Sequence, residues 1–370
     1  MSVGLTAERE ELARSVGGFL AERTPMAEVR RLMADPTGHD PAVWRQMGKE
    51  FALQGIAVPE EYGGAGYGYA ELAVVFEQMG KTLLPSPFFA TVALALPALL
   101  ASGDEAAMRE YAPGLAAGES VGTLAWVEDD GAWRGGNATN ATNSDGAWTI
   151  EGHKTYVVDG SAADLILVIA ETPDGRSLFA VSGDASGLDR QATPSFDQTR
   201  RLARIELHGT AARLVGEAGR GDEILAAALD RAAVLLAAEM VGGAQACLDM
   251  SVGYAKQREQ FGRLIGSFQA IKHKCAEILV ELEGARAAAY YGAWAADASP
   301  AELPLVASIA KATASEAFFH AAGENVQMHG GIGVTWEYDA HLYLKRAKTS
   351  SILLGDPSFH RQRLADLVEL

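Results

Sequence analysis

The chain contains little cysteine and little positive charge. Its 370 residues include two cysteines, Cys247 and Cys275, which lie far apart in apolar, helix-like segments. This pattern predicts neither a disulfide framework nor a metal site, and it is typical of a protein in a reducing cytoplasm. Lys and Arg number 31 against 48 Asp and Glu, which gives a formal net charge of −17. We therefore expect neither nucleic acid nor an anionic membrane as a partner.

Long apolar runs and common targeting or nucleotide signals are also missing. The apolar stretch near residues 90–100 is interrupted by Pro97 and is too short to cross a bilayer. The first residues show no basic segment followed by an apolar one, so no secretion signal is expected. The sequence lacks a strand followed by Gly-x-Gly-x-x-Gly and a helix, which argues against nicotinamide dinucleotide binding. These absences predict a cytoplasmic protein.

The N-terminal third is predicted to be helical. Because apolar residues make up 48% of the chain, burial is not limiting, and the length calls for two or three packed units. Thr6 and Asp40 are positioned to cap two amphipathic helices. Further helices are expected at about residues 69–83, 88–101 and 104–117. Together these elements predict an N-terminal helical domain over residues 1–118.

The pattern changes near Gly118 to short segments rich in Thr, Val, Ile, Tyr and Trp. Such segments, bounded by Gly, Asp and Asn, predict the strands of a small antiparallel sheet or barrel. The strands are expected at residues 121–127, 148–150, 154–158, 165–170, 177–181 and 201–207. The polar cluster at residues 137–143 is interpreted as a loop. A β domain is therefore predicted over residues 119–217.

Helical periodicity returns in the last part of the chain. Helices are expected to start at Asp222 and after a cap at Ser267, to span about residues 303–327, and to follow Asp339 and Pro357. Long antiparallel helices with short connections form a four-helix bundle, here over residues 218–370. The predicted fold class is mainly α with a small central β domain.

Two segments in this last part contain arginine, aromatic and glycine residues in a fixed order. Residues 254–269 read YAKQREQFGRLIGSFQ, and residues 327–333 read QMHGGIG. Arg258 can donate two hydrogen bonds to phosphate oxygens, and Gly330 and Gly331 let the backbone approach a ligand closely. Together the segments resemble the Arg-x-x-Phe-Gly and Gln-x-x-Gly-Gly-x-Gly motifs of the acyl-CoA dehydrogenase family, which hold the diphosphate arm of FAD.

This resemblance implies an architecture and a cofactor site. The order of helical domain, β domain and helical bundle is that of the family. The resemblance also implies that seven residues reach the FAD whose flavin lies in a neighbouring subunit: Arg258, Phe261, Phe268, Gln269, Gln327, Gly330 and Gly331. Alternatively, the two phenylalanines are core residues and Arg258 is a solvated charge.

The resemblance fails at the catalytic base. Dehydrogenation of an acyl thioester requires a carboxylate that removes the α proton, while hydride leaves the β carbon for the flavin. Most family members place this Glu in a Tyr-Glu-Gly-Thr segment, but residues 351–356 here read SILLGD, with Leu354 at the Glu position. Some members use a position on the long helix instead, where Ala232 stands. Asp356 is a weak candidate base that we interpret as a helix cap, and Glu239 is interpreted as a packing carboxylate.

Contacts to the flavin of the same chain also depart from the family pattern. The family's Thr-Glu-Pro-Gly-x-Gly-Ser-Asp loop corresponds to residues 127–133, which read VEDDGAW. The family's Trp-Ile-Thr strand, whose Thr bonds the flavin ring, corresponds to residues 156–158, which read YVV. Residues that hold the chain's own flavin are therefore degraded, whereas those that reach a neighbour's diphosphate are intact.

The sequence thus most resembles the actinobacterial heteromeric acyl-CoA dehydrogenases of steroid side-chain degradation. This resemblance implies a subunit without its own base, in a two-plus-two heterotetramer with a homologous partner that has one. It further implies a bulky, steroid-type acyl-CoA substrate and an electron-transfer flavoprotein as the acceptor. Two alternatives remain: a self-sufficient homotetramer with Asp356 or Glu239 as base, and a non-enzymatic paralogue without flavin.

Overall fold

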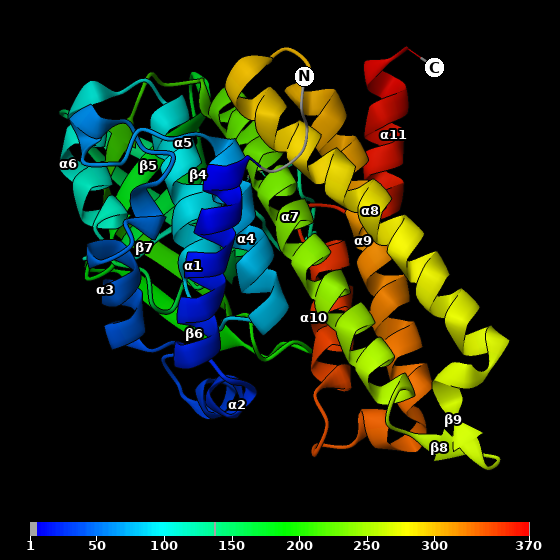
Figure 1. Ribbon diagram of the computed structural model, residues 1–370. Coiled ribbons are helices and arrows are strands. Elements are labelled where there is room, and N and C mark those ends of the chain that lie inside the picture. The colour runs from blue at the N-terminus through cyan, green and yellow to red at the C-terminus, as the bar shows by residue number, and fades with distance from the viewer. Residues whose placement is uncertain (1–5, 137, 370) are drawn as a thin grey trace. The chain divides into compact units, whose positions relative to one another are not determined.

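The structure is a computed structural model that describes residues 6–136 and 138–369 (Figure 1). Backbone contacts group the chain into two units. The first unit comprises Met1–Arg30, Tyr69–Leu84 and Ala233–Leu370, and the second comprises Arg31–Gly68 and Pro85–Ala232. Within the described residues, no helix has both the length and the hydropathy needed to cross a membrane.

The first unit is almost entirely helical. Its elements are α1 (Ala7–Arg23), α4 (Tyr69–Thr82), β8 (Glu259–Gln260), β9 (Arg263–Leu264), η4 (Ile265–Ser267), α8 (Gln269–Ala298), α9 (Leu303–His329), η5 (Gly330–Val334), α10 (Ala340–Ile352) and α11 (Pro357–Leu367). The helices α2 (Met26–Ala34) and α7 (Gly221–Ala255) contribute residues to both units. Helix α9 packs against α8, α10 and α11. Figure 1 shows α7 to α10 as the long helices of the predicted bundle.

The second unit combines short helices with all the strands of the larger sheet. Its helices are α3 (Pro41–Lys49), η1 (Leu53–Gly55), η2 (Glu60–Tyr62), the π-helix η3 (Phe89–Ala95), α5 (Leu96–Ala101) and α6 (Glu105–Ala116). Its strands are β1 (Gly122–Ala125), β2 (Asn140–Ser144), β3 (Ala147–Val158), β4 (Leu165–Thr172), β5 (Gly175–Ser182), β6 (Leu188–Thr193) and β7 (Leu202–Val215).

The seven strands form a sheet that closes on itself. The strand order is β1-β4-β2-β3-β7-β5, and a further pairing of β4 with β5 completes a ring. Strand β6 pairs with β7, and β1 runs parallel to β4. Closure leaves few unpaired backbone groups at sheet edges. The predicted fold class, mainly helical with a central β domain, is confirmed. The boundaries of the three predicted domains remain a prediction. Within the described residues, all strands lie between Gly122 and Val215, except for the short β8–β9 pair.

Several predicted helix starts are confirmed by side-chain caps. The Thr6 side chain accepts a hydrogen bond from the amide of Arg9 at 3.3 Å, and Asp40 accepts one from the amide of Ala42 at 2.7 Å. The helix expected at residues 88–101 exists, but its first part is a π-helix. The amide of Leu96 donates to the Thr91 carbonyl, five residues back, and the proline that follows has no N–H to continue the pattern.

Three local predictions were wrong. Residues 140–144 form strand β2 rather than a loop, because their backbone pairs with β3 although four of the five side chains face solvent; Asn137 lies outside the described residues. Strand β6 was missed for the same reason, since its side chains are mostly exposed. Ser267 does not cap α8, because its hydroxyl donates to the Leu264 carbonyl at 2.6 Å and the helix starts at Gln269.

Candidate functional site

A two-stranded hairpin follows α7 and presents an aromatic residue to solvent. Strands β8 and β9 pair so that Phe261 and Gly262 form the connecting turn, with φ of 54° and 75°. Two positive φ values match a type I′ turn, which strongly favours Asn or Gly over a bulky residue at its first central position. Phe261 is nevertheless there and is 92% exposed. It is therefore not a core residue, and its unfavourable conformation makes it a candidate for contact with a ligand.

Arg258 is fixed at its backbone and open at its side chain. Its amide donates to the Tyr254 carbonyl at 2.9 Å, and its carbonyl accepts from the Ile265 amide at 2.8 Å. Its exposed guanidinium makes no hydrogen bond or ion pair within the part of the chain that the structure describes. Phe268, half-buried, meets the Phe261 ring edge-on at 6.2 Å. The Arg263 guanidinium lies over the Phe268 ring at 3.9 Å, so the Arg258 guanidinium and the exposed Phe261 ring are the groups open to a ligand.

The glycine segment at the end of α9 is equally open. Gly330 has φ 64° and ψ −147°, a backbone conformation that essentially only glycine adopts. A Cβ atom added at Gly330 or Gly331 would meet nothing within 4 Å, and both residues are exposed, as is Gln327. Exposed backbone N–H groups in a tight turn favour anions. The Gly330 amide itself donates to the Gln327 carbonyl, so the segment offers a ligand close backbone approach and the exposed side-chain amide of Gln327.

The structure brings the two segments to one end of the first unit. The Tyr254 ring, at the end of α7, stacks on the His329 imidazole at the end of α9, with ring centroids 4.2 Å apart. Figure 1 shows β8 and β9 beside the end of α9. The seven predicted cofactor residues therefore share this end, although Gln269 is placed only by its position as the exposed first residue of α8.

These residues fit the diphosphate arm of FAD. An unpaired guanidinium and a side-chain amide are donors that phosphate oxygens require, and the exposed glycines let the backbone come close to them. An exposed phenylalanine suits the flat face of an adenine. Because the donors face outward from the first unit, they suit a cofactor that a second chain helps to hold. Their role as cofactor residues remains a prediction.

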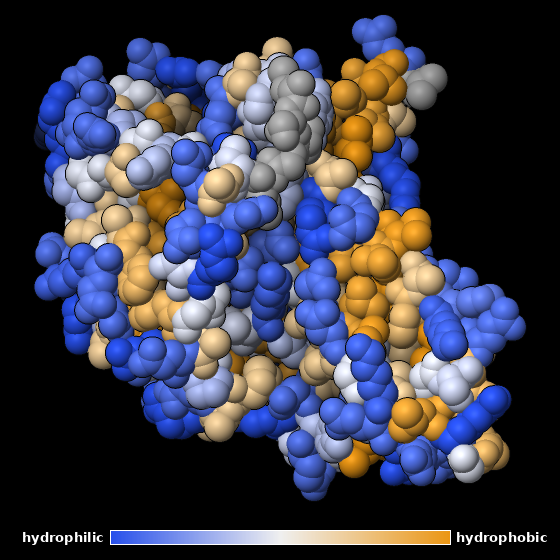
Figure 2. Space-filling view, in the orientation of Figure 1, coloured by the Kyte–Doolittle hydropathy of each residue, from blue (hydrophilic) through white to orange (hydrophobic). Residues whose placement is uncertain are grey.

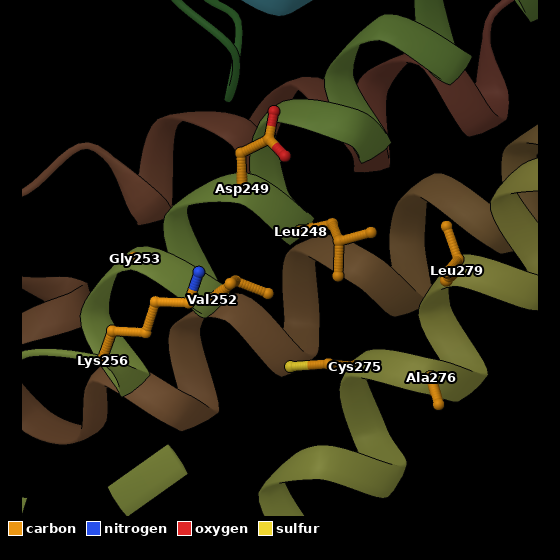
Figure 3. Close-up of a pocket in the computed structure, with 8 residues that line it drawn as sticks. All are labelled: Leu248, Asp249, Val252, Gly253, Lys256, Cys275, Ala276 and Leu279. Atoms are coloured by element: carbon orange, nitrogen blue, oxygen red, sulfur yellow. The ribbon is translucent and has the colours of Figure 1, made fainter. Parts of the chain in front are cut away.

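A groove of about 430 Å³ lies between α7 and α8, next to the same end (Figure 3). Leu248, Val252 and Cys275 lie between the two helices, whereas the Asp249 carboxylate points away from this apolar floor (Figure 3). Lys256 extends along the rim. An apolar floor does not suit a diphosphate and suits apolar side chains instead, although Lys256 at its rim belongs to the arginine segment.

The position of the expected base is occupied by a buried leucine in a well-held turn. Leu354 is 4% exposed and has φ 64°. The buried ammonium of Lys311 donates to the Ser351 carbonyl at 3.2 Å and to the Gly355 carbonyl at 2.9 Å. His360 Nε2 lies 3.0 Å from the Leu354 carbonyl oxygen, to which it donates. Burial lowers the pKa of Lys311 to about 7 and that of His360 to about 4. The turn is thus built, but it carries no proton acceptor at residue 354.

The other candidate bases are engaged or absent. Ala232 is fully buried and apolar. Asp356 accepts a hydrogen bond from the Phe359 amide at 2.8 Å and caps α11, as interpreted from the sequence. Glu239 accepts from Arg346 at 2.8 Å, and both side chains are less than one-tenth exposed. Glu239 is therefore a packing carboxylate, and Arg346 is not part of a solvated basic face.

The loop that replaces the family's flavin contact is organised around a buried carboxylate that the sequence did not single out. Glu128 accepts from the ammonium of Lys154 at 2.8 Å and from the amides of Ala138 and Thr139 at 2.9 and 3.0 Å. Burial alone would raise the pKa of Glu128, but Lys154 and these amides outweigh it and lower the pKa to about 2. The Glu128 carboxylate is therefore a structural anion and not a proton acceptor.

Val158, which stands where the family's flavin-bonding Thr is expected, offers no hydroxyl. Val158 is fully buried, and its carbonyl accepts from the Thr123 hydroxyl at 2.6 Å. Sequence reasoning also gave no role to Tyr254 and Tyr338, whose rings lie against His329. The recurrence of aromatics beside the two glycine motifs is the sequence signal that could have identified them.

Comparison with known proteins defines the class. The chain matches the acyl-CoA dehydrogenase N-terminal domain over residues 6–119 and the acyl-CoA dehydrogenase C-terminal domain over residues 219–368. The chain therefore belongs to the acyl-CoA dehydrogenase family, whose members are flavin-dependent oxidoreductases that bind FAD. The resemblance seen in the two motifs is confirmed.

Individual relatives span the whole chain. Acyl-CoA dehydrogenase IpdE2 of Mycobacterium tuberculosis is 37% identical over 362 residues, which cover 96% of each chain. A structure described as the Tcur3481-Tcur3483 steroid ACAD superposes with a TM-score of 0.88 at 31% identity, over 100% of this chain and 99% of that chain. The ChsE4-ChsE5 complex from Mycobacterium tuberculosis superposes with a TM-score of 0.91 at 26% identity, over 100% and 99%.

Proposed function

We propose that this chain is a subunit of a flavin-dependent acyl-CoA dehydrogenase that contributes cofactor contacts but no catalytic base. The observation that carries the proposal is Leu354, a buried leucine in the turn where the family's base is expected. The two nearby alternatives, Asp356 and Glu239, are engaged in a helix cap and a buried ion pair. A homologous partner chain must therefore supply the carboxylate.

In this proposal the chain's own residues bind and orient the cofactor. FAD, when bound, accepts the hydride that leaves the β carbon of the acyl-CoA. Arg258 and Gln327 hold the diphosphate arm, Gly330 and Gly331 let the backbone approach it closely, and Phe261 covers the adenine. Phe268 supports Phe261, and Gln269 donates from the start of α8. The partner's carboxylate takes the α proton.

The relatives support a particular assembly and substrate class. One structural neighbour is described as a steroid ACAD, and another is a complex of two named proteins. We propose a two-plus-two heterotetramer in the cytoplasm that dehydrogenates a bulky, steroid side-chain-type acyl-CoA. An electron-transfer flavoprotein is the proposed acceptor, by family resemblance.

The first experiment measures flavin content and assembly mass for this chain alone and for this chain co-expressed with a homologue that has the Glu. We expect FAD only in the mixed complex, at about half a flavin per chain, because two of four sites lack their own flavin contacts. A yellow homotetramer of this chain alone, with one FAD each, would contradict the proposal. A mixed complex without flavin would favour the non-enzymatic paralogue.

Arg258→Ala tests the diphosphate contact within that mixed complex. We expect loss of one charged hydrogen-bonding partner to weaken FAD binding about tenfold to a hundredfold, with assembly mass unchanged. Binding is measured by flavin fluorescence on reconstitution of the apo complex. Arg14→Ala, an exposed arginine on α1, is the matched control and should have no effect. Equal affinity for both variants would remove the Arg258 assignment.

Asp356→Asn tests whether the chain carries a relocated base. Asparagine also caps helices well but cannot accept a proton at neutral pH, so stability should change by less than about 0.5 kcal/mol and turnover of the mixed complex should stay the same. Steady-state kinetics and thermal unfolding give the two readouts. A fall in turnover by several orders of magnitude would make Asp356 the base and favour the homotetramer.

A further inference from the structure

Three aromatic rings lie directly beneath the two cofactor segments. Tyr254 and His329 stack with centroids 4.2 Å apart and planes 27° from parallel. Tyr338 meets both rings edge-on, at 6.4 Å from Tyr254 and 5.6 Å from His329. The rings come from the end of α7, the end of α9 and the turn before α10. Stacked and edge-on pairs of this kind hold elements in a fixed relation.

Each ring of the stack is tied by the backbone to one cofactor segment. The Tyr254 carbonyl accepts the amide of Arg258 at 2.9 Å, so the position of Tyr254 sets where the arginine leaves the chain. His329 directly precedes Gly330. A Cβ atom at Gly333 would lie 2.9 Å from the His329 Cβ, so only glycine lets η5 fold back against the imidazole. A shift at the stack therefore moves both segments.

The imidazole is also fixed in its own plane. His329 Nδ1 lies 2.8 Å from the Asn325 carbonyl oxygen, so Nδ1 must carry a hydrogen and donate it. The Asn325 side chain is fully buried and accepts from the Ser251 hydroxyl at 3.1 Å. This hydrogen bond is a second contact between α7 and α9, about one helical turn from the stacked rings. His329 itself is 8% exposed.

We infer that Tyr254, His329 and Tyr338 are positioning residues that hold the arginine segment and the glycine segment at a fixed separation for a diphosphate. The inference rests on the proposed function for the identity of the anion. Within the described residues, no hydrogen bond, ion pair or ring contact joins residues 256–269 directly to residues 330–334. The ring cluster is therefore the contact that links the two segments. Pre-organisation of donors lowers the entropy lost on binding, so the cluster raises affinity without touching the ligand.

Two matched pairs of variants test the cluster. In the first pair, His329→Ala removes the stack and His329→Phe keeps an aromatic ring. In the second pair, Tyr254→Leu removes the stack and Tyr254→Phe keeps the ring. The second pair tests the inference if His329→Ala does not fold. One readout is the FAD dissociation constant of the reconstituted mixed complex. The other is amide hydrogen exchange of this chain alone at residues 259–264 and 330–334, which needs no flavin.

We expect Tyr254→Leu and His329→Ala to raise the FAD dissociation constant about tenfold and Tyr254→Phe to stay within about twofold, because the ring contact carries the effect. His329→Phe keeps the ring but loses the hydrogen bond to the Asn325 carbonyl, so its dissociation constant should fall between these limits. Amide exchange should accelerate at both segments in the two non-aromatic variants and at neither segment in Tyr254→Phe. Acceleration at one segment only, unchanged FAD affinity in the non-aromatic variants, or a Tyr254→Phe variant as weak as Tyr254→Leu would overturn the inference. If Arg258→Ala leaves FAD binding unchanged, the proposed function fails separately, and the exchange data still decide whether the rings couple the segments.

Discussion

At the scale of single residues, the most consequential features are buried charge pairs between residues far apart in the sequence. Lys154 is fully buried and reaches Glu128, 26 positions away, in the loop that replaces the family's flavin contact. Glu239 pairs with Arg346 across 107 positions. Desolvation makes each pair of modest net value, but removal of one partner leaves a buried charge without compensation. These pairs therefore favour the one fold in which both partners of each pair meet.

Lys154→Met tests the cost of leaving the buried Glu128 carboxylate without its partner in the β domain. We expect the free energy of unfolding to fall by about 3–5 kcal/mol, because the Glu128 carboxylate stays buried among amides without its ammonium. Urea denaturation of this chain alone gives the value. Arg204→Ala is the control, since its ion pairs with Asp129 and Glu206 are partly exposed, and it should cost less than about 1 kcal/mol. Similar costs for the two variants would contradict the argument.

At the scale of elements, helices α4 and α7 cross at two glycines. A Cβ atom at Gly80 would lie 1.9 Å from the Glu239 carbonyl oxygen, and one at Gly242 would lie 1.9 Å from the Glu77 carbonyl oxygen. The contact is reciprocal, so each helix presents a glycine to the backbone of the other. The two backbones can approach this closely only because both positions lack a side chain. This crossing joins α4 to the helices that carry the cofactor segments.

Gly80→Ala should force α4 and α7 apart. We expect a loss of about 3 kcal/mol in the free energy of unfolding, since backbone atoms cannot rotate away from the new methyl group. Gly18→Ala, in the middle of α1 with nothing within 4 Å of the added Cβ, should instead stabilise the chain by about 0.5–1 kcal/mol. Thermal unfolding of both variants makes the comparison, and a stable Gly80→Ala protein would show that the crossing can adjust.

At the scale of the whole molecule, the helices of the first unit carry exposed apolar side chains. Leu279 and Val280 on α8 are 47% and 73% exposed, and Phe319 on α9 is 45% exposed. Leu279 lines the groove with α7, and Val280, the next residue on α8, is the most exposed of the three. Figure 2 shows apolar residues gathered over the helices of the first unit. Apolar patches of this kind mark protein–protein contacts.

Val280→Glu should weaken assembly without harm to the fold. A charge in an apolar interface opposes association, so we expect the dissociation constant of the mixed complex to rise at least about tenfold. Mass photometry over a dilution series measures it, and unfolding of this chain alone should change by less than about 0.5 kcal/mol. Tyr67→Glu introduces the same charge at an exposed aromatic of the second unit and is the control. Undiminished assembly of the Val280 variant would exclude this face as the contact.

Local patterns were sufficient for most of the helices and most of the sheet, although the helix α2 (Met26–Ala34) was not predicted. Thr6, Asp40 and Asp356 are caps because their side chains reach amides two or three residues away, which the sequence displays directly. Strands β2 and β6 could not be predicted, since their exposed side chains carry little periodicity and their pairing depends on β3 and β7. The π-helix at residues 89–95 was likewise hidden, because it reflects packing around a proline and not a residue preference.

The sequence by itself determined the family, the order of helical and β segments, and the leucine at position 354, where the family pattern places a Glu, because each is a matter of which residues occur at which spacing. Only the tertiary structure decided that Glu239 is neutralised by Arg346 and that Glu128 is held by Lys154. It also brought Tyr254 against His329, 75 positions apart by number, and so placed two motifs at one end of the bundle. The physical reason is that the partner of a buried charge or ring is chosen by chain folding, which local spacing does not encode.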